Sequence, residues 1–548
     1  MVKIDVLPDG SDGILPDDIL LIIFDFYIGE YQDGHTFEAG RPQGPRIKSW
    51  QLLVHVCRRW RGLVFGSPRH LNLQLYCTTT TPARETLEVW PTFPLHIQGG
   101  VSETSVDNVI AQLKQSDRIL QIQLNLFFDT ARQIEKLWTA MQVPFPELAA
   151  LYLSFGNISF VPILPDSFLG GSAPHLQHLA LNSISFPALP KLLLTATHLV
   201  SLYLCQIPHS GYISPEAMIT YLSMLTSLET LEFRFKSPQS SPDQGIQRSS
   251  LPTRSLLPAF TVLRFKGDNE YLEDLVSRID APKFLFLSAT VFNDIVFDTP
   301  ELIRFISRSS TFKAPNGAHL FLDSLTASFK LQLQASDTQD FEVTVLCREP
   351  NWQLSFLAQI CATSFPLLST TEILFIDQRP GSQLDWKNGI ENIEWLELLL
   401  PFTAVKYLYL SKEIAPHIAP ALQGMAGGGT TEVLSSLQNL YLEGFDRSLS
   451  AQEGIKRFIS ARQLTNRPVA ISAWRKGWSN PKDAKRGVQV TLDAIDDIRF
   501  CEKLFGQWMT EINKCVVNHF SRRHVTSDDN NGLTESRAAP ISQKNESK

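Results

Sequence analysis

Hydrophobic residues crowd together near the beginning of the chain in a way that one helix face cannot accommodate. The segment 14–28 reads ILPDDILLIIFDFYI, and from Ile19 onward only Asp25 interrupts the large apolar side chains. Pro16 suits a first helical position, and the two aspartates that follow it favour the positive end of a helix dipole. The pattern therefore predicts a helix that begins near Pro16.

The apolar residues of this predicted helix fall into two stripes. A surface helix normally buries a single stripe of about three or four positions per two turns. One stripe here holds Leu15, Ile19, Ile22, Ile23 and Phe26, and the other holds Leu20, Phe24 and Ile28. Two stripes require two partners, so the helix is either buried inside a large core or shared between its own domain and another protein.

A membrane or a secretory leader does not explain the segment. A bilayer span needs about 20 apolar residues, and this run is shorter and interrupted. The preceding residues, MVKIDVLPDGSDG, are acidic where a signal peptide would be basic. We expect no membrane contact.

A second amphipathic pattern follows in SWQLLVHVCRRWRGLVFGSP. Leu53, Val56, Trp60 and Leu63 recur at helical spacing and predict one helix that ends near Gly66 and Pro68. The arginines between them, Arg58 and Arg59 among others, suit a solvated face.

Together the two segments resemble the F-box family. LPDDILLIIF is similar to the leading Leu-Pro and first helix of that motif, and VCRRWRGLV is similar to its later half, although the loop between Ile28 and Ile47 is longer than usual. The resemblance implies docking on the Skp adaptor of SCF-type ubiquitin ligases and, through it, on cullin and RING subunits. By matching positions the adaptor contacts are Leu15, Pro16, Ile19, Leu20, Ile23 and Phe24, with Val56, Cys57 and Trp60 as further contact or support. The alternative is that these residues are ordinary core, which is an equal reading for Val56 and Trp60.

Past residue 75 the pattern becomes a repeat. LxxLxL-like copies begin at residues 119, 148, 176, 199, 228, 260, 405 and 437, with weaker copies near Leu285 and Leu374. The first six are spaced by 23 to 32 residues, which is typical of leucine-rich repeats. Helix starts lie between copies at Ser214–Pro215, at Thr299–Pro300 and at Ser450 with Glu453. The sequence predicts an α/β fold, an irregular leucine-rich-repeat-like βα solenoid. It is expected to be irregular because Gly156, Ile184 and Ile207 stand where Asn or Cys is usual.

These patterns divide the chain into four parts. We expect a flexible arm at 1–14, an F-box domain at 15–75, a solenoid with a C-terminal helix at 76–520, and a polar, disordered tail at 521–548. The SP-rich stretch 236–255 is predicted to be an inserted loop. The whole chain resembles F-box proteins of basidiomycete fungi with such a C-terminal region.

Charge and cysteine content narrow the function classes. The net charge of −7 and the 19% of charged residues give no basic footprint for nucleic acid. The seven cysteines are odd in number, scattered, and never spaced as CxxC. That usage is typical of reduced thiols, so we expect a cytoplasmic or nuclear protein without a structural zinc site.

The sequence gives no catalytic motif. QGMAGGGTTEV at 423–433 lacks the GK[ST] of a phosphate-binding loop, and there is no HExxH or GxSxG. His175 and His178 have no third ligand at characteristic spacing, and the acids Asp496 and Asp497 suit the wet side of a helix. We expect no enzyme activity, no metal and no cofactor.

Two functions remain: a substrate receptor of a ubiquitin ligase, and an interaction scaffold that is not assembled into a ligase. In either case the residue between the last two apolar positions of each LxxLxL should face a concave wall. Aromatic residues are frequent there, and tyrosine is common in binding hot spots. The resulting target-binding hypothesis names Tyr152, Tyr203, Tyr409 and Tyr441. The alternative is that aromatic residues are there because they favour strands, and that a loop or the C-terminal helix covers this face. This alternative is slightly favoured for Phe286 and Phe375, which lie in the weakest repeats.

Overall fold

The computed structural model describes residues 15–29, residues 488–490 and, with short gaps, residues 49–474. Within 49–474 the longest gaps are 239–253 and 380–391. The expected arm at 1–14, the helix at 492–520 and the tail at 521–548 therefore lie outside the described residues, as does most of the insertion at 236–255.

The helices run in chain order from a small N-terminal group to a long series that alternates with strands. Their bounds are α1 Asp17–Gly29, α2 Ser49–Val54, α3 Arg58–Gly66, α5 Val106–Leu113, α6 Ala131–Ala140, α7 Leu189–Thr195, α8 Pro215–Leu222, α9 Asn269–Ser277, α10 Pro300–Arg308, α11 Pro350–Ser364, α12 Asn392–Leu399, α13 Ala415–Met425 and α14 Leu449–Leu464. Short 3-10 turns are η1 Ser116–Arg118, η2 Phe168–Gly171, η3 His209–Gly211 and η5 Pro366–Thr370.

The described strands form a 17-stranded sheet and a separate two-stranded pair, β8 with β10. The bounds are β1 Leu75–Thr78, β2 Leu95–Val101, β3 Ile119–Leu126, β4 Ala150–Phe155, β5 His178–Asn182, β6 Ser201–Ile207, β7 Thr230–Phe235, β8 Ser255–Leu256, β9 Val262–Gly267, β10 Ile279–Asp280, β11 Phe286–Phe292, β12 Pro315–Leu322, β13 Thr326–Leu333, β14 Asp340–Leu346, β15 Ile373–Gln378, β16 Tyr407–Leu410, β17 Asn439–Glu443, β18 Ala470–Trp474 and β19 Val488–Val490. Each predicted repeat copy supplies a strand of the large sheet, so the predicted α/β solenoid is confirmed.

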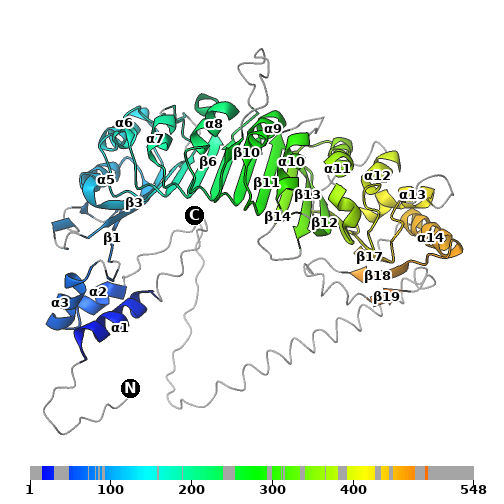
Figure 1. Cartoon of the computed structure of the whole chain (residues 1–548), viewed down its shortest axis with the longest axis horizontal. Coiled ribbons are helices and arrows are strands. Elements are labelled where there is room, and N and C mark those ends of the chain that lie inside the picture. The colour runs from blue at the N-terminus through cyan, green and yellow to red at the C-terminus, as the bar shows by residue number, and fades with distance from the viewer. Residues whose placement is uncertain are drawn as a thin grey trace, which may run out of the picture.

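The large sheet curves, with helices along its outer side and the strands along its inner side (Figure 1). Buried and partly exposed residues alternate strictly along β5, β7 and β9, and along most of the strands between β3 and β9. In β7, Leu231, Phe233 and Phe235 are buried while the residues between them are partly exposed. Buried residues of the strands from β1 to β18, apart from β8, pack beneath the helices in one continuous core. The alternate set therefore forms a long concave surface, which we call the concave face.

Two departures from regular repetition confirm the expected irregularity. Gln206 adopts a left-handed backbone with φ of 51°, and the pairing of β6 with β7 shifts register between Leu204 and Ile207. This extra residue directs the Ile207 side chain into the core, where it is fully buried. An apolar side chain therefore occupies the position at which Asn is usual in leucine-rich repeats, where it would bond the turn backbone.

The second departure is a meander of three strands. β14 pairs parallel with β11, β13 pairs antiparallel with both β14 and β12, and β12 pairs parallel with β15. The poorly matching stretch between Leu285 and Leu374 is therefore this meander. Sequence reading missed it because its strands lack the LxxLxL spacing.

Two predicted helix boundaries need correction. α14 begins at Leu449, so Ser450 lies inside the helix and not before its first residue. The single helix predicted from SWQLLVHVCRRWRGLV is instead two helices, α2 and α3. Cys57 has an extended backbone between them, and its Sγ accepts a hydrogen bond from the Trp60 amide at 3.4 Å. A side-chain cap thus starts a new helix where apolar spacing alone indicated continuity.

The three N-terminal helices pack on the beginning of the solenoid through aromatic rings. Trp50 of α2 is 3% exposed, and its ring lies edge-on to Trp90 and to Phe93 at centroid distances of 5.3 and 5.4 Å. Val64 of α3 is fully buried in the same continuous core. The helical unit α1–α3 is thereby anchored to the strands that follow it.

A second hydrophobic cluster lies on the concave face near its C-terminal end. It contains Ile373, Tyr409 and Tyr441, with Phe375 and Tyr407 against it. The Tyr409 ring stacks between Phe375, at 4.4 Å, and Tyr441, at 4.3 Å, because these three residues occupy the same register position on adjacent strands. We call these three stacked rings the aromatic ladder.

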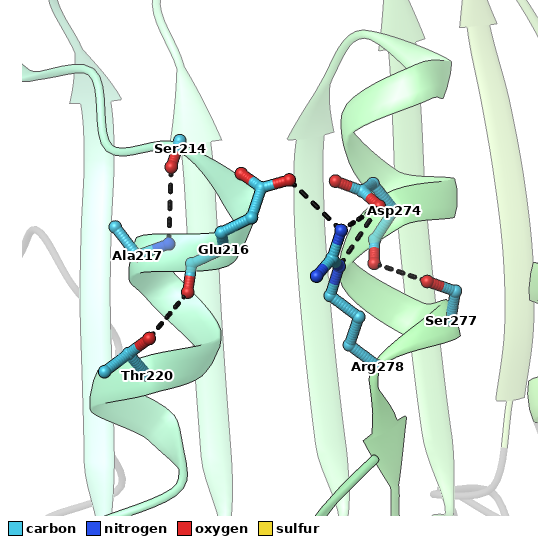
Figure 2. A network of polar contacts seen from close by, with 7 residues as sticks. All are labelled: Ser214, Glu216, Ala217, Thr220, Asp274, Ser277 and Arg278. Atoms are coloured by element: carbon cyan, nitrogen blue, oxygen red, sulfur yellow. Dashed lines mark hydrogen bonds and ion pairs between the residues drawn. The ribbon is translucent and has the colours of Figure 1, made fainter. Parts of the chain in front are cut away.

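On the outer side, an ion-pair network joins successive helices (Figure 2). Arg278, which ends α9, donates from Nη2 to Glu216 of α8 and to Asp274 of α9, both at 3.1 Å. Burial, and then the hydrogen bond with Glu216, raise the pKa of Asp274. Burial acts on Glu216 in the same direction, but hydrogen bonds from its own backbone, Asp274 and Ser214 outweigh it and lower the pKa of Glu216. Arg278 therefore holds two neighbouring carboxyl groups.

Replacing Arg278 with Met should lower the free energy of unfolding by about 1 kcal/mol at pH 7, because the partly buried Asp274 and the exposed Glu216 lose their shared cation. In the wild type, the contributions of Glu216 and Asp274 to the free energy of unfolding change in opposite directions with pH. That of Glu216, whose pKa is lowered, is lost as the pH falls through its folded pKa, and that of Asp274, whose pKa is raised, is lost as the pH rises through its folded pKa. In the variant, protonation relieves the repulsion, so the loss should shrink at pH 4.

Urea unfolding at both pH values measures this effect. The control is Arg457→Met, which removes an exposed pair with Glu453 on α14 and should cost less than about 0.5 kcal/mol. Equal losses for the two variants at pH 7 would show that the network contributes nothing beyond a surface pair.

The aromatic ladder should contribute far more stability than tyrosines elsewhere on the concave face. Tyr409→Ala removes a side chain that is 2% exposed and stacked on both sides, so we expect a loss of about 3–5 kcal/mol. Tyr203→Ala, at a half-buried position, should cost about 1 kcal/mol. Thermal melts of the two variants give the comparison, and similar losses would contradict it.

Candidate functional site

The helix α1 carries the most concentrated exposed apolar surface near the start of the described chain. Leu15, Ile19, Ile22, Ile23 and Phe26 are all exposed, and the Phe26 side chain reaches 73%. These five residues are the first of the two stripes found in the sequence, and we call them the exposed stripe. Large apolar side chains gathered on one helix face mark an interaction surface more often than scattered ones do.

The second stripe of α1 faces inward. Leu20, Phe24 and Ile28 are 4% or less exposed. The Phe24 ring lies edge-on to Trp60 of α3 at 4.8 Å. Leu20 and Phe24, predicted as adaptor contacts, are therefore interior residues of the helical unit. The correction follows from the helical period, because positions 20, 24 and 28 share the side of α1 that packs on α2 and α3.

Arg59 holds the first residues of α1 in place, although the sequence predicted that its side chain lies on a solvated face. Its Nε and Nη2 reach Asp17 Oδ1 at 3.0 and 2.6 Å, and Nη2 also donates to the Leu15 carbonyl at 2.5 Å. The exposed Leu15–Pro16 segment is thus held beside the start of α3. The signal in the sequence was an acidic first turn followed by an arginine run, but no spacing rule connects residues so far apart.

The remaining predicted adaptor residues divide by exposure. Val56 and Cys57 are exposed in the turn between α2 and α3, beside the Arg59 corner. Trp60 is half-buried against Phe24 and therefore supports the packing of α1. Ile22 and Phe26, which were absent from the predicted contacts, are the two most exposed members of the stripe. The stripe itself was the signal that identified them.

On the concave face, parallel pairing aligns one residue of each strand into a continuous row. The row passes through Tyr152, Ala180, Tyr203, Glu232, Arg264 and Ser288. Across the meander it continues through Glu342, Lys330 and His319, and then through Phe375, Tyr409, Tyr441 and Ser472. Phe286 is not part of this row, because it pairs with Val262 and lies two residues earlier on the same face.

The four tyrosines of the target-binding hypothesis have two different environments. Tyr409 and Tyr441, at 2% and 6% exposure, belong to the aromatic ladder and offer little surface to a partner. Tyr152 and Tyr203 are half-buried and flank the small Ala180. Burial, with a further contribution from Tyr203, raises the pKa of Tyr152 to about 12, so its phenol is neutral at physiological pH. Tyr152 and Tyr203 are therefore the more accessible pair, and target binding by any of the four tyrosines stays a prediction.

The structure places only some of the residues that the sequence analysis weighed as catalytic or metal-binding. No group of three or more His, Cys, Asp or Glu residues in the part of the chain that the structure describes could hold a metal ion. His178 begins β5, half-buried, where burial lowers its pKa, whereas His175 is exposed in the preceding turn. Most of QGMAGGGTTEV, together with Asp496 and Asp497, lies outside the described residues.

Two further observations concern helices and thiols. Among the described helices, none has both the length and the apolar character that crossing a bilayer requires. Cys57, Cys77, Cys205, Cys347 and Cys361 form no disulfide. Cys501 and Cys515 lie outside the described residues.

Comparisons with known proteins give no family for this chain. No family model matches it, and no curated protein matches it. Among solved structures, it is similar to the leucine-rich repeat-containing protein LegL7 from Legionella pneumophila, with 12% identity over 70% of this chain and 97% of that chain. The TM-score of 0.24 is too low to carry an argument. The description of the chain as a leucine-rich-repeat-like solenoid therefore rests on its own strand order and register.

Proposed function

We propose that this protein is the substrate-recognition subunit of an SCF-type E3 ubiquitin ligase. In this proposal the helical unit α1–α3 docks the Skp adaptor, the adaptor connects to cullin and RING subunits, and the concave face holds a target protein. The observation that carries it is the division of α1 into a buried stripe and an exposed stripe. The buried stripe satisfies the fold, so the exposed stripe is left for a partner.

The refined adaptor surface consists of Leu15, Pro16, Ile19, Ile22, Ile23 and Phe26, with Val56 and Cys57 at the neighbouring turn. Arg59 positions this surface by holding Asp17 and the Leu15 carbonyl. Burying five large apolar side chains against a partner is worth several kcal/mol, at about 25 cal/mol per Å² of apolar area. That gain must also offset the entropy of association, so a partner with a matching apolar groove is required.

A receptor of this kind performs no chemistry. It joins a target to the ligase, which raises the effective concentration of target lysines near the activated ubiquitin. Its working parts are two separate surfaces joined rigidly. The aromatic packing of Trp50 on Trp90 and Phe93 provides that connection between the helical unit and the solenoid.

A second candidate is an interaction scaffold that is not assembled into a ligase. The features that favour it are the half-buried Tyr152 and Tyr203 on the concave face, which do not depend on the adaptor surface. Copurification of the full chain with a cullin separates the two candidates, because only the ligase subunit requires it.

Lysine at two positions of the exposed stripe should abolish adaptor binding. In Ile19→Lys/Ile23→Lys, two charged side chains would have to be buried on docking, at a cost of several kcal/mol each. The free protein should melt as the wild type does, because both positions are exposed. Pull-down of purified Skp adaptor with the full chain is the measurement.

The matched control is Leu194→Lys, at a position on α7 that is 48% exposed and far along the solenoid. It should bind the adaptor normally. Leu20→Ala is expected to reduce both thermal stability and binding, because Leu20 lies inside the helical unit. Normal adaptor capture by Ile19→Lys/Ile23→Lys would refute docking through this stripe.

The paired substitution Tyr152→Ala/Tyr203→Ala tests the concave face as the target site. We expect loss of target capture by affinity purification followed by mass spectrometry, with adaptor binding unchanged and a loss of stability of no more than about 2 kcal/mol. A large drop in melting temperature would instead show that these tyrosines hold the sheet together.

A further inference from the structure

A cluster of cations lies in the middle of the concave face, on two adjacent strands. Arg234 of β7 pairs in register with Lys266 of β9, and Glu232 of β7 pairs with Arg264 of β9. All four side chains are on the concave side and only partly buried. We call Arg234, Arg264 and Lys266 the basic cluster.

One carboxylate lies among these three cations. Glu232 Oε1 is 3.0 Å from Arg234 Nε, its Oε2 is 3.9 Å from Arg264 Nη1, and the Cys205 thiol donates to Oε1 at 3.2 Å. Burial, followed by Glu232, raises the pKa of Cys205 to about 12, so this thiol stays neutral. Glu232 therefore offsets only one of the three positive charges.

The flanking strands do not offset the excess. At the corresponding register positions, β6 carries Tyr203 and Cys205, and β11 carries Ser288 and Thr290. The surface thus has two positive charges in excess, although the whole chain has a net charge of −7. Such a local reversal of sign attracts an acidic ligand.

Two of the cations are held in place by aromatic rings. The Arg264 guanidinium lies 5.0 Å from the centre of the Phe286 ring, and Lys266 Nζ lies 5.4 Å from that of Phe292. The side chains of Arg234 and Arg264 remain 42% and 37% exposed. Cationic groups that are already ordered and still accessible lose less entropy when an anion binds.

We propose that the basic cluster binds an acidic, extended segment of a target protein. Adjacent strands lie about 4.8 Å apart, and an extended peptide advances about 3.3 Å per residue, so the cluster matches two or three neighbouring carboxylates. Duplex DNA needs a longer track of cations than two strands supply. The proposal rests on the proposed use of the concave face for targets, and it does not depend on adaptor docking.

The direct test is the affinity of the full chain for a fluorescein-labelled oligoglutamate peptide, measured by fluorescence anisotropy. Arg234→Glu/Lys266→Glu should weaken binding about tenfold, because two attractions become repulsions. The matched control is Arg132→Glu/Lys136→Glu, which makes the same charge change at exposed positions of α6 on the outer side. It should leave the affinity within about twofold of wild type.

A variant that binds more tightly is needed as well, because misfolding could explain a loss of binding but not a gain. Thr290→Lys adds a cation beside Lys266, on the row that also holds Arg234, and should tighten binding several-fold, with the gain diminishing as salt is added. Unchanged affinity in both Arg234→Glu/Lys266→Glu and Thr290→Lys would overturn the proposal. Equal loss in the outer-side control would do so too, since it would show only nonspecific charge attraction.

Two comparisons fix the class of ligand and separate this inference from the ligase proposal. Single-stranded DNA that bound as tightly as oligoglutamate, with the same loss in Arg234→Glu/Lys266→Glu, would make this a general polyanion site and overturn the assignment to a protein segment. Adaptor pull-down is run on the same preparations. Oligoglutamate binding without adaptor capture would contradict the ligase role but would still support the proposed role of the basic cluster.

Discussion

The in-register pairing of parallel strands is the constraint on which this structure depends. Side chains alternate between the two faces of a strand, so a slip of one residue would turn a buried leucine row outward. The pairs from Tyr152 through Arg264 keep that register across five strands. One physical rule therefore produces both the continuous core under the helices and the ordered rows of the concave face.

The same constraint explains how much of the fold was predictable. Leucine spacing located most strands of the large sheet, because the core row repeats with the strand. The residues Ser214 and Pro215 marked the start of α8 because a helix needs a side-chain cap and a proline fits its first position. The meander was not predictable, because its strands pair across a longer stretch of sequence and carry no repeat signature. The turn at Cys57 was missed for a related reason, since apolar period alone cannot reveal a change of backbone conformation.

The candidate surfaces were predictable in part. The two stripes of α1 were visible in the sequence, but which of them faces inward depends on the positions of α2 and α3, which a helical wheel does not contain. For the concave face, alternation correctly predicted that Tyr152 and Tyr203 lie on it. It could not show that Tyr409 is enclosed by rings on both sides, nor that Arg59 spans forty residues of sequence to hold Asp17. Burial and long-range ion pairs are properties of the assembled fold.

The β12–β14 meander has a consequence for the way the chain folds. In a regular solenoid each new strand adds to the strand before it, so order can spread along the array one repeat at a time. Here β11 is continued in the sheet by β14, which emerges from the chain after β12 and β13. Growth from the N-terminal side must therefore wait until the later strand arrives, and the sheet between β11 and β15 is filled in the reverse of chain order. The chain loses the entropy of closing that loop before it gains the free energy of strand pairing. The meander is therefore a kinetic boundary between two halves of one continuous sheet.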